Sequence, residues 1–395
     1  MNHASPESVG ISSEQLAHIS PSMQQYVDSN RVAGIVTLAA RRGQVVHLDS
    51  WGVQDLKTQA PMQTDSIFRI FSMTKPIVSV ALMMMFEQGK FQLFDPISKY
   101  LPKFESVKVM NVDGSTEALA GPITFHHVLT HQSGLSYGFF QDSPVEKLYQ
   151  EAKLFDPMRP LGTFIDMVAE LPLCFQPGAG WRYSVATDVV GRLVELMADM
   201  PLADYLQEKI LRPLNMTDTN YWTAQENAAR LTTLYGDTIE HGRMTPMDVP
   251  PKTPHLHPNV GQRGGSGLLS TAQDYVKFAQ MILNKGRYEG QRFLGPRTVD
   301  YMTQNHIPAS HFPLTIGTPM MGLGFGLGFS VIMDTSANGV MGSIGNHGWS
   351  GMADTHFWVD SKEDLIGITC TQYIAEEITN IRHDFKNILY SAIMD

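Results

Sequence analysis

The chain has 395 residues, of which 17% are charged and 43% hydrophobic, so it is long enough for a large core built in two or three layers. Its formal net charge of −10, without any basic block, argues against nucleic acid and anionic membranes as partners. The N-terminus lacks the basic and apolar regions of a secretory signal, and the longest apolar run, 77–86, is too short to span a bilayer. Two cysteines, Cys174 and Cys370, are typical of a reducing compartment. We therefore expect a cytoplasmic protein.

The first ninety residues predict a helix, a hairpin and a second helix. Ser12 or Ser13 can cap a helix that runs to about Asn30. Two β-like runs follow within 33–51 and are joined by a short polar turn, which predicts a hairpin. The apolar segment 77–86, with a glycine three residues beyond its end, predicts a buried helix with a C-terminal stop.

The middle of the chain has a different character. Residues 90–260 alternate helical patterns with connections rich in proline and glycine, and they contain few convincing strands. The expected helices lie at 125–131, 162–171, 187–199 and 202–211. We predict that 90–260 forms a mostly helical second domain, inserted into an α/β sheet domain made of residues 1–89 and 261–395.

The C-terminal part returns to the sheet domain after the glycine-rich residues 264–267. Ser270 and Gln273 make a plausible capping box for a helix that runs to Asn284. Antiparallel strands are expected at 325–333, 355–359 and 365–371, and a final helix at about 376–393. Both ends of the chain would then build one antiparallel sheet flanked by N- and C-terminal helices. This α+β arrangement places an active site in the cleft between the two domains.

The segment Ser72-Met73-Thr74-Lys75-Pro76 contains the strongest candidate nucleophile. Residues i and i+3 share a face of a helix, so the Ser72 hydroxyl and the Lys75 amine can meet. A serine is a poor nucleophile until a neighbouring base takes its proton, and a desolvated lysine can be that base. Pro76 fits only the first turn of a helix, where Ser72 would lie near N–H groups able to hold an oxyanion.

Two further segments carry candidate site residues. Tyr183 follows a turn at Pro177-Gly178 and precedes the helix expected at 187–199, so it lies on a loop. A phenol near an ammonium loses its proton more readily and can relay protons, although a loop tyrosine is more often a packed aromatic. Residues 346–352 form a glycine-rich strand edge whose N–H groups can bind an anionic oxygen, with a packed tryptophan in a turn as the alternative.

Taken in chain order, the motifs form a recognisable set. They are Ser72-Met73-Thr74-Lys75, Leu129-Thr130-His131-Gln132-Ser133-Gly134-Leu135, Gln176-Pro177-Gly178 leading to Tyr183-Ser184, residues 264–271, and Trp349-Ser350-Gly351 near Val359-Asp360. The sequence resembles the serine hydrolases that share the fold of class C β-lactamases and penicillin-binding proteins. Among these it most resembles the family VIII carboxylesterases.

The resemblance implies a β-lactamase/transpeptidase-like fold, an α/β sandwich with a helical domain, and no metal or organic cofactor. It implies that Ser72 is the acylated nucleophile, with Lys75 and Tyr183 as the general acid/base pair. The N–H groups of Ser72 and Met352 would form the oxyanion hole. Trp349 and Gly351 would lie in the substrate-binding site.

Two departures from the β-lactamase pattern bear on the substrate. Val185 stands where those enzymes carry an asparagine, and Trp349 stands where they carry a lysine that binds a carboxylate. An indole and a valine offer neither a charge nor a donor–acceptor pair. We therefore expect a serine carboxylesterase acting on neutral, short- to medium-chain esters as small-molecule partners. A β-lactamase, a D-amino-acid peptidase or an acyltransferase on the same scaffold stays open, as does a non-catalytic binding protein.

Other motifs in the chain are weaker. Gly134-Leu135-Ser136-Tyr137-Gly138 matches the G-x-S-x-G elbow of α/β-hydrolases, but no strand precedes it, so Ser136 is not expected to be the nucleophile. His126-His127, and His255 with His257, lack the spacing and partners of zinc sites. We expect no metal.

Overall fold

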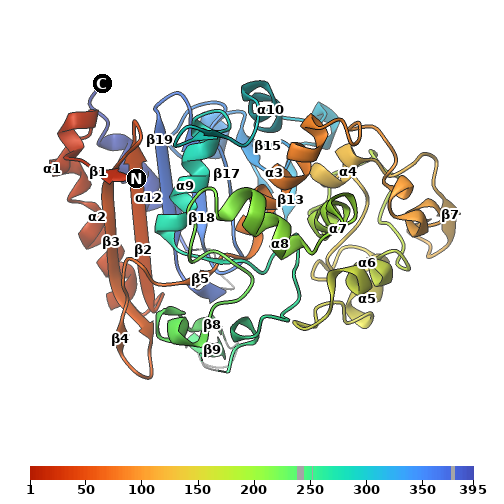
Figure 1. Ribbon diagram of the computed structural model, residues 1–395, viewed down its shortest axis with the longest axis horizontal. Coiled ribbons are helices and arrows are strands. Elements are labelled where there is room, and N and C mark those ends of the chain that lie inside the picture. The colour runs from red at the N-terminus through yellow and green to blue at the C-terminus, as the bar shows by residue number, and fades with distance from the viewer. Residues whose placement is uncertain (238–243, 251, 375–378) are drawn as a thin grey trace.

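A long sheet is built from both ends of the chain (Figure 1). The computed structural model describes residues 1–237, 244–250, 252–374 and 379–395. Its strands follow the order β1-β3-β2-β19-β18-β17-β16-β15, and β4 pairs with β3; all pairings are antiparallel except that of β1 with β3. The strands are β1 (Asn2–His3), β2 (Gly34–Arg41), β3 (Gln44–Asp55), β4 (Ala60–Pro61), β15 (Leu323–Phe325), β16 (Ser330–Ile332), β17 (His347–Ser350), β18 (His356–Asp360) and β19 (Leu365–Cys370).

The hairpin predicted for 33–51 is confirmed as β2 and β3. Arg42 and Gly43 link the two strands, with φ of 49° and 76° respectively. Positive φ at both turn residues is the type I′ geometry that suits the twist of a hairpin. Every residue of β2 is buried, because the strand lies in the middle of the sheet and both of its faces are covered.

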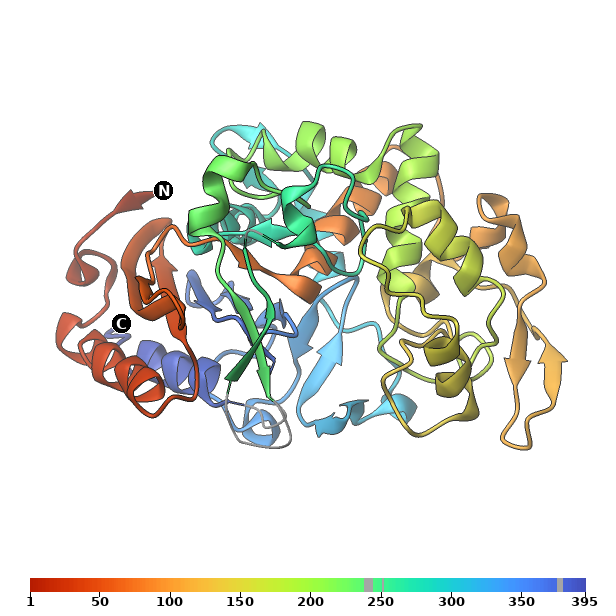
Figure 2. The same cartoon turned by 90° about the horizontal axis from the view of Figure 1, so that it is seen from below.

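Three helices cover one face of the sheet, and Figure 2 shows two of them, α2 in red and α12 in blue, side by side. They are α1 (Ser13–Leu16), α2 (Ile19–Asp28) and α12 (Ile381–Ser391). The predicted cap at Ser12 is confirmed, because its hydroxyl accepts from the N–H of Gln15. A single helix to Asn30 was wrong: the helix breaks and restarts at Ile19, which puts Pro21 in a first turn. The final helix begins at Ile381, and the predicted start at 376 lies outside the described residues.

On the opposite face lie α3 (Thr74–Glu87) and α9 (Ala272–Leu283). The predicted buried helix is confirmed as α3, in which Pro76 occupies the first turn and most side chains are buried all round. Because it is apolar on every side, α3 can pack between the sheet and the helical region. The cap of α9 is Thr271, whose hydroxyl accepts from the N–H of Asp274, and the capping box predicted at Ser270 is off by one residue.

The helical region follows α3 in the chain and packs around α7. Its helices are α4 (Phe125–Leu129), α5 (Pro144–Glu151), α6 (Leu161–Val168), α7 (Ala186–Ala198) and α8 (Leu202–Leu206), which continues as a π turn over Gln207–Leu211. All four predicted helices are confirmed within a few residues, and α5 was missed. The hairpin of β8 (Leu234–Asp237) and β9 (Met244–Asp248) pairs with β20 (Tyr373–Ile374), so 90–260 is joined to the C-terminal part by a sheet. The division at residues 90 and 260 stays a prediction.

The strand predicted at 325–333 is two strands, β15 and β16, which pair with each other. Gly326 and Gly328 make the turn between them. A Cβ at Gly326 would lie 2.1 Å from the Met302 carbonyl oxygen, and Gly328 has a φ of 91°. The remaining short elements are β11 (Arg287–Tyr288), β12 (Gln291–Arg292), β13 (Leu314–Ile316), β14 (Thr318–Met320), β6 (Lys108–Met110), β7 (Thr116–Ala118), α10 (Pro296–Met302) and α11 (Thr335–Asn338).

A buried arginine joins the segments that lead into the site. Arg69 lies on β5 (Phe68–Arg69), which pairs with β10 (Leu269–Ser270), and only 2% of the residue is exposed. Its guanidinium donates to the Asp248 carboxylate at 2.8 Å, to the Thr232 carbonyl at 2.7 Å and to the Thr253 hydroxyl at 3.2 Å. One side chain therefore ties the strand before Ser72 to the 232–253 segment.

We predict that Arg69→Met lowers the free energy of unfolding by about 3 kcal/mol, because it removes the cation paired with the Asp248 carboxylate and the guanidinium donor to the buried Thr232 carbonyl. Guanidinium denaturation would measure the loss. Arg297, whose side chain is 95% exposed, gives the control variant Arg297→Met, which should change stability by less than about 0.5 kcal/mol. Equal stability of the two variants would contradict the structural role of Arg69.

Candidate active site

Ser72 lies in a tight turn between β5 and α3. A 3-10 turn covers Phe71–Met73, and α3 begins at Thr74. Phe71 has a φ of 43°, a left-handed backbone conformation that is uncommon for a residue with a bulky side chain. The turn is held in place by Tyr275, whose hydroxyl donates to the Met73 carbonyl at 2.7 Å. The result is a serine that is partly exposed at the edge of an otherwise buried helix.

The Lys75 side chain is fully buried beneath this serine. Its ammonium donates to Ser72 Oγ at 3.1 Å, to the hydroxyl of Tyr137 at 2.8 Å and to the carbonyl oxygen of Gly265 at 2.7 Å. An ammonium has three N–H donors, so these three acceptors satisfy it completely. The amine is thereby held within reach of the Ser72 hydroxyl.

Tyr183 meets the same hydroxyl from the other side. It lies on the loop before α7, is 7% exposed, and donates from its hydroxyl to Ser72 Oγ at 2.6 Å. Lys75 Nζ lies 4.6 Å from the centre of the Tyr183 ring. The serine, lysine and tyrosine predicted from the sequence are therefore together in the structure, although more than a hundred residues separate the serine from the tyrosine.

Trp349 also reaches this cluster. It lies on β17, and its indole N–H donates to the Tyr183 hydroxyl oxygen at 3.3 Å. A donor at this position stabilises negative charge on the phenol oxygen. From the sequence we assigned Trp349 only to the substrate-binding site; its bond to Tyr183 was not foreseen.

Tyr137 could not be predicted from its motif, because the G-x-S-x-G pattern indicates a role only for the serine. Burial, with Tyr183 and Asp188 nearby, holds the pKa of the Tyr137 phenol well above its usual range, so Tyr137 stays protonated and neutral beside Lys75. Ser136 is fully buried and hydrogen-bonded to Glu146, and it accepts from Arg182 Nε at 2.7 Å. The G-x-S-x-G motif thus supplies Tyr137 as a hydrogen-bond partner of Lys75, whereas its serine is closed off from solvent.

A second missed residue, Asp188, supports the lysine from below. It is 2% exposed, and its carboxylate accepts from the N–H of Gly265 at 3.0 Å, while the carbonyl of Gly265 accepts from Lys75. A Cβ at Gly265 would lie 2.6 Å from the Asp188 carboxylate and 3.3 Å from the Tyr137 hydroxyl, so only glycine fits there. Burial raises the pKa of Asp188, and the positive charges of Arg263 and Lys75 oppose that rise.

The end of β17 approaches the serine turn closely. A Cβ at Gly351 would lie 2.5 Å from the carbonyl oxygen of Ile70, so the strand can come this near only with glycine at that position. Ser72, Tyr183, Trp349, Gly351 and the half-exposed Met352 line one cavity of about 620 Å³. The residues predicted for the oxyanion hole and for substrate binding therefore lie around the same cavity as Ser72.

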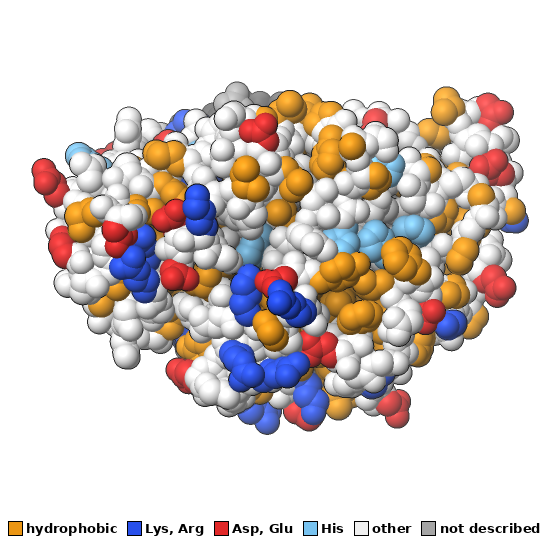
Figure 3. Space-filling model, turned by 90° about the horizontal axis from the view of Figure 1, so that it is seen from above, with side chains coloured by type: hydrophobic (Ala, Val, Ile, Leu, Met, Phe, Trp, Pro, Cys, Tyr) orange, Lys and Arg blue, Asp and Glu red, His pale blue; other side chains and the backbone are white. Residues whose placement is uncertain are grey.

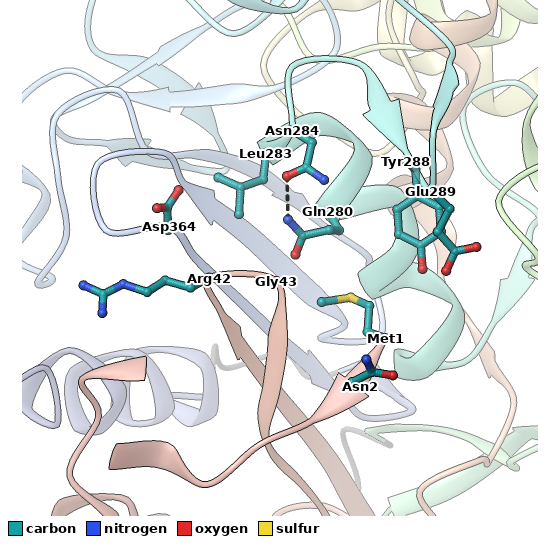
Figure 4. A pocket seen from close by; sticks show the side chains of 10 residues that line it. All are labelled: Met1, Asn2, Arg42, Gly43, Gln280, Leu283, Asn284, Tyr288, Glu289 and Asp364. Carbon is teal, nitrogen blue, oxygen red and sulfur yellow. Dashed lines mark hydrogen bonds between the residues drawn. The ribbon is translucent and has the colours of Figure 1, made fainter. Parts of the chain in front are cut away.

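A different cavity, of about 520 Å³, lies between β1, the β2–β3 turn and the end of α9. Figure 4 shows its side chains, among which Gln280 donates to Asn284 at 2.9 Å. None of its lining residues is a serine, cysteine or histidine. The chemistry suggested by the sequence therefore belongs to the cavity that contains Ser72.

Of the histidines noted in the sequence, His126 and His255 have ring nitrogens within hydrogen-bonding distance of protein neighbours. His126 Nε2 lies 3.3 Å from His306 Nδ1, and histidine side chains gather on the face shown in Figure 3. His255 Nδ1 lies 3.0 Å from the Tyr221 carbonyl oxygen. Within the described residues, no group of three or more metal-ligating side chains could hold a metal ion. Nor does any helix in this part of the chain have the length and apolar character needed to cross a membrane.

A serine whose hydroxyl contacts a lysine and a tyrosine, at the edge of an antiparallel sheet next to a helical region, is the arrangement expected of the serine hydrolases that the sequence resembles. The beta-lactamase family model matches residues 20–373, and the chain belongs to this family. Protein Rv1367c of Mycobacterium tuberculosis is 32% identical over 89% of this chain and 88% of its own length. Esterase EstB of Burkholderia gladioli is 29% identical over 87% of each chain.

Among solved structures, EstCE1, described as a hydrolase with promiscuous acyltransferase activity, superposes with a TM-score of 0.82. It is 26% identical and covers 95% of this chain and 99% of its own. These comparisons confirm the predicted resemblance to family VIII esterases and the β-lactamase/transpeptidase-like fold. The expectation of an enzyme of the hydrolase type is confirmed with them.

We predict that Ser72→Ala abolishes covalent labelling by a fluorophosphonate, because the labelled oxygen is lost. Ser136→Ala is the matched control, since it removes the same atom from the competing motif. It should keep the label on Ser72, identified by peptide mass spectrometry. A label that survives Ser72→Ala and disappears in Ser136→Ala would reverse the assignment of the nucleophile.

Proposed function

We propose that this protein is a serine carboxylesterase that hydrolyses short- to medium-chain carboxylic esters through an acyl-enzyme on Ser72. One observation carries the proposal: the Lys75 amine and the Tyr183 phenol both contact the hydroxyl of a partly exposed serine that faces a cavity. The names of two similar proteins, an esterase and a hydrolase, support it.

The pair acts as a base in the form that has released one proton, with Lys75 as a neutral amine or Tyr183 as a phenolate. In the acylation step, Ser72 Oγ then attacks the ester carbonyl carbon and its proton passes to this Lys75–Tyr183 pair. The new C–O bond gives a tetrahedral oxyanion. When this collapses, the bond to the alcohol oxygen breaks, and the same proton moves to the leaving alkoxide. Water then attacks the acyl-enzyme, loses a proton to the pair, and Ser72 recovers its proton as the acid leaves.

We assign the oxyanion hole to the backbone N–H groups of Ser72 and Met352. Ser72 lies in the turn that leads into α3, where N–H groups lack helical partners, and Met352 follows the close approach at Gly351. Two donors from rigid segments on opposite sides of the carbonyl would stabilise the charge that develops in the transition state.

The immediate surroundings of the reacting bond favour an ester over a β-lactam. Val185 is fully buried, and Trp349 has its N–H committed to Tyr183, so neither offers a partner to a carboxylate next to the scissile carbonyl. Burying a carboxylate there without a partner costs about 2–5 kcal/mol. An ester with no charge close to its carbonyl avoids this cost.

We predict that 4-nitrophenyl butyrate is turned over with a kcat/KM at least about 100-fold above that of a chromogenic cephalosporin, the ratio that about 3 kcal/mol gives. Spectrophotometry under identical conditions measures both. Ser72→Ala should remove both activities, and a brief exposure to the ester should add the butyryl mass to Ser72. A higher kcat/KM for the cephalosporin would overturn the assignment in favour of a β-lactamase. A protein without turnover or acylation would be a binding protein.

Acyl transfer is the second candidate, favoured by the description of EstCE1 as a hydrolase with promiscuous acyltransferase activity. An acyl-enzyme reacts with whichever hydroxyl reaches it, and a cavity of about 620 Å³ can admit an alcohol beside the acyl group. We predict that added butanol diverts part of the acyl-enzyme to butyl butyrate, measured by gas chromatography. Formation of acid alone at molar butanol would exclude this second activity.

The proposal also covers the cellular location of the protein and its binding partners. We place it in the cytoplasm, with a small-molecule ester as partner and neither nucleic acid nor membrane as a binding surface. The free thiols of Cys174 and Cys370 and the net charge of −10 support this.

A further inference from the structure

The cavity that contains Ser72 has a second, cationic end. Three residues of α12, Arg382, His383 and Lys386, line it together with Ser350 of β17. The apolar side of α12, which includes Phe385, packs against the sheet and α2. One helix therefore closes part of the core and also presents basic side chains to the substrate cavity.

Lys386 is the most unusual of these side chains, because only 6% of the residue is exposed and its ammonium has no ion pair within 4.0 Å and no hydrogen bond among the described residues. Its neighbours are aromatic rings: Nζ lies 5.3 Å from the ring centre of Trp358 and 5.8 Å from that of Tyr390. Because Lys386 lines the cavity, a bound anion can reach its ammonium and supply the acceptor that the described residues do not.

Arg382 adds an independent observation. One guanidinium nitrogen donates to Ser350 Oγ at 3.2 Å, while Nε is buried and has no hydrogen-bond partner within the described ranges. A guanidinium binds a carboxylate through two parallel N–H groups. Its unused Nε–H is the kind of donor that a bound anion would occupy.

Among the described residues, the carboxylates near this end of the cavity bond to other groups, and none of them lines the cavity. Asp360 accepts from the Tyr390 hydroxyl at 2.6 Å and from the N–H of Ser343 at 3.1 Å. Asp354 accepts from the Thr379 hydroxyl, and Asp384 accepts from the Tyr26 hydroxyl at 2.5 Å.

The basic groups also act on one another. Burial lowers the pKa of His356 well below its usual range, and the positive charges of Arg382 and Lys386 lower it further; the same causes lower the pKa of His383. Burial lowers the pKa of Lys386 to about 8, although the charge of Asp360 opposes the shift. An anion held between Arg382 and Lys386 would relieve this repulsion.

We propose that this end of the cavity binds a carboxylate carried by the substrate at a distance from its ester bond. The proposal deepens the proposed function, because it takes Ser72 as the nucleophile. Arg382 bonds to Ser350 at the end of β17, whereas the oxyanion hole is assigned to Ser72 and Met352 beyond that strand, so the anion site is set apart from the reacting carbonyl. The linker between ester and carboxylate must therefore be several carbons long.

The walls between the two ends of the cavity suit such a linker. They carry apolar side chains, among them Met320, Met321, Ile332 and Val340. Unbranched methionine side chains adapt to a flexible chain, so an alkyl linker would be desolvated there. The substrate class is thus an ester with an apolar chain that ends in a carboxylate, either on the acyl side or on the alcohol side.

The test compares esters that differ only in the distal charge. The acyl arm uses 4-nitrophenyl hemisuberate against 4-nitrophenyl octanoate, with the short hemisuccinate as a length control. The alcohol arm uses the butyrate ester of 8-hydroxyoctanoic acid against octyl butyrate. We expect at least one long anionic ester to exceed its neutral partner in kcat/KM by about tenfold or more, as a charge-assisted contact gives, and the hemisuccinate to show no such gain.

Lys386→Met keeps the volume of the side chain and removes its charge, and we expect it to lower this anionic-to-neutral ratio about tenfold. Lys103→Met is the matched control, since it removes a charge that is 55% exposed and lines no part of the cavity; it should leave the ratio unchanged. In the wild-type protein the ratio should fall as pH rises through about 8, because Lys386 loses its charge while the carboxylate keeps its own.

A separate measurement distinguishes failure of this proposal from failure of the proposed function. Suberate binding to Ser72→Ala, measured by calorimetry, needs no turnover, and we expect the further change Lys386→Met to weaken it at least about tenfold. Suberate binding without hydrolysis of any ester would contradict the proposed function but support the anion site. Equal kcat/KM values for charged and neutral esters at every pH, or suberate binding indifferent to Lys386, would overturn the anion site. If Lys386→Met does not fold, the pH course of the wild-type ratio decides.

Discussion

A lysine with no access to solvent must find an acceptor for each of its three N–H groups, and the site around Ser72 depends on how Lys75 does so. Its acceptors are Ser72 in its own turn, Tyr137 from the loop after α4, and the carbonyl of Gly265 from the glycine-rich return to the sheet. Segments about 60 and 190 residues away along the chain must therefore be in place before the amine is satisfied. The hydrogen bonds of Lys75 are therefore complete only when these distant segments have folded together.

The two ends of the cavity differ in chemistry, because different elements line them. On one side, Tyr183 and Trp349 form an aromatic and hydrogen-bonded wall next to the nucleophile, and they leave no cation for a charge close to the reacting carbonyl. On the other side, α12 brings Arg382 and Lys386 to the far end of the same space. Next to Ser72 the one cationic side chain, Lys75, is already bonded to protein acceptors, whereas Arg382 and Lys386 face the far end of the cavity. The chain could thus keep recognition of an anion while changing the class of bond that it attacks.

Sequence patterns predicted the elements whose neighbours are local, and failed where contacts are distant. The hairpin of β2 and β3, the helix after Ser72 and the final helix follow from periodicity and turn residues that the chain itself displays. The split of the first helix was visible in Pro21 but was overridden by the apolar pattern around it. Tyr137 and Asp188 could not be found, because nothing in their local sequence shows that they face a lysine far away along the chain. Ser72, Lys75 and Tyr183 were predicted because their motifs follow one another along the chain as they do in the hydrolases that the sequence resembles.

The left-handed backbone at Phe71 has a consequence of its own. Holding a side chain of that size at a φ of 43° costs on the order of 1–2 kcal/mol, which the packed turn around Ser72 must offset. Natural selection for a more durable protein would relax this residue, and selection for a well-aimed hydroxyl would retain it. The two pressures oppose each other at Phe71. Substitutions that raise thermal stability without moving Ser72 are therefore expected elsewhere in the chain.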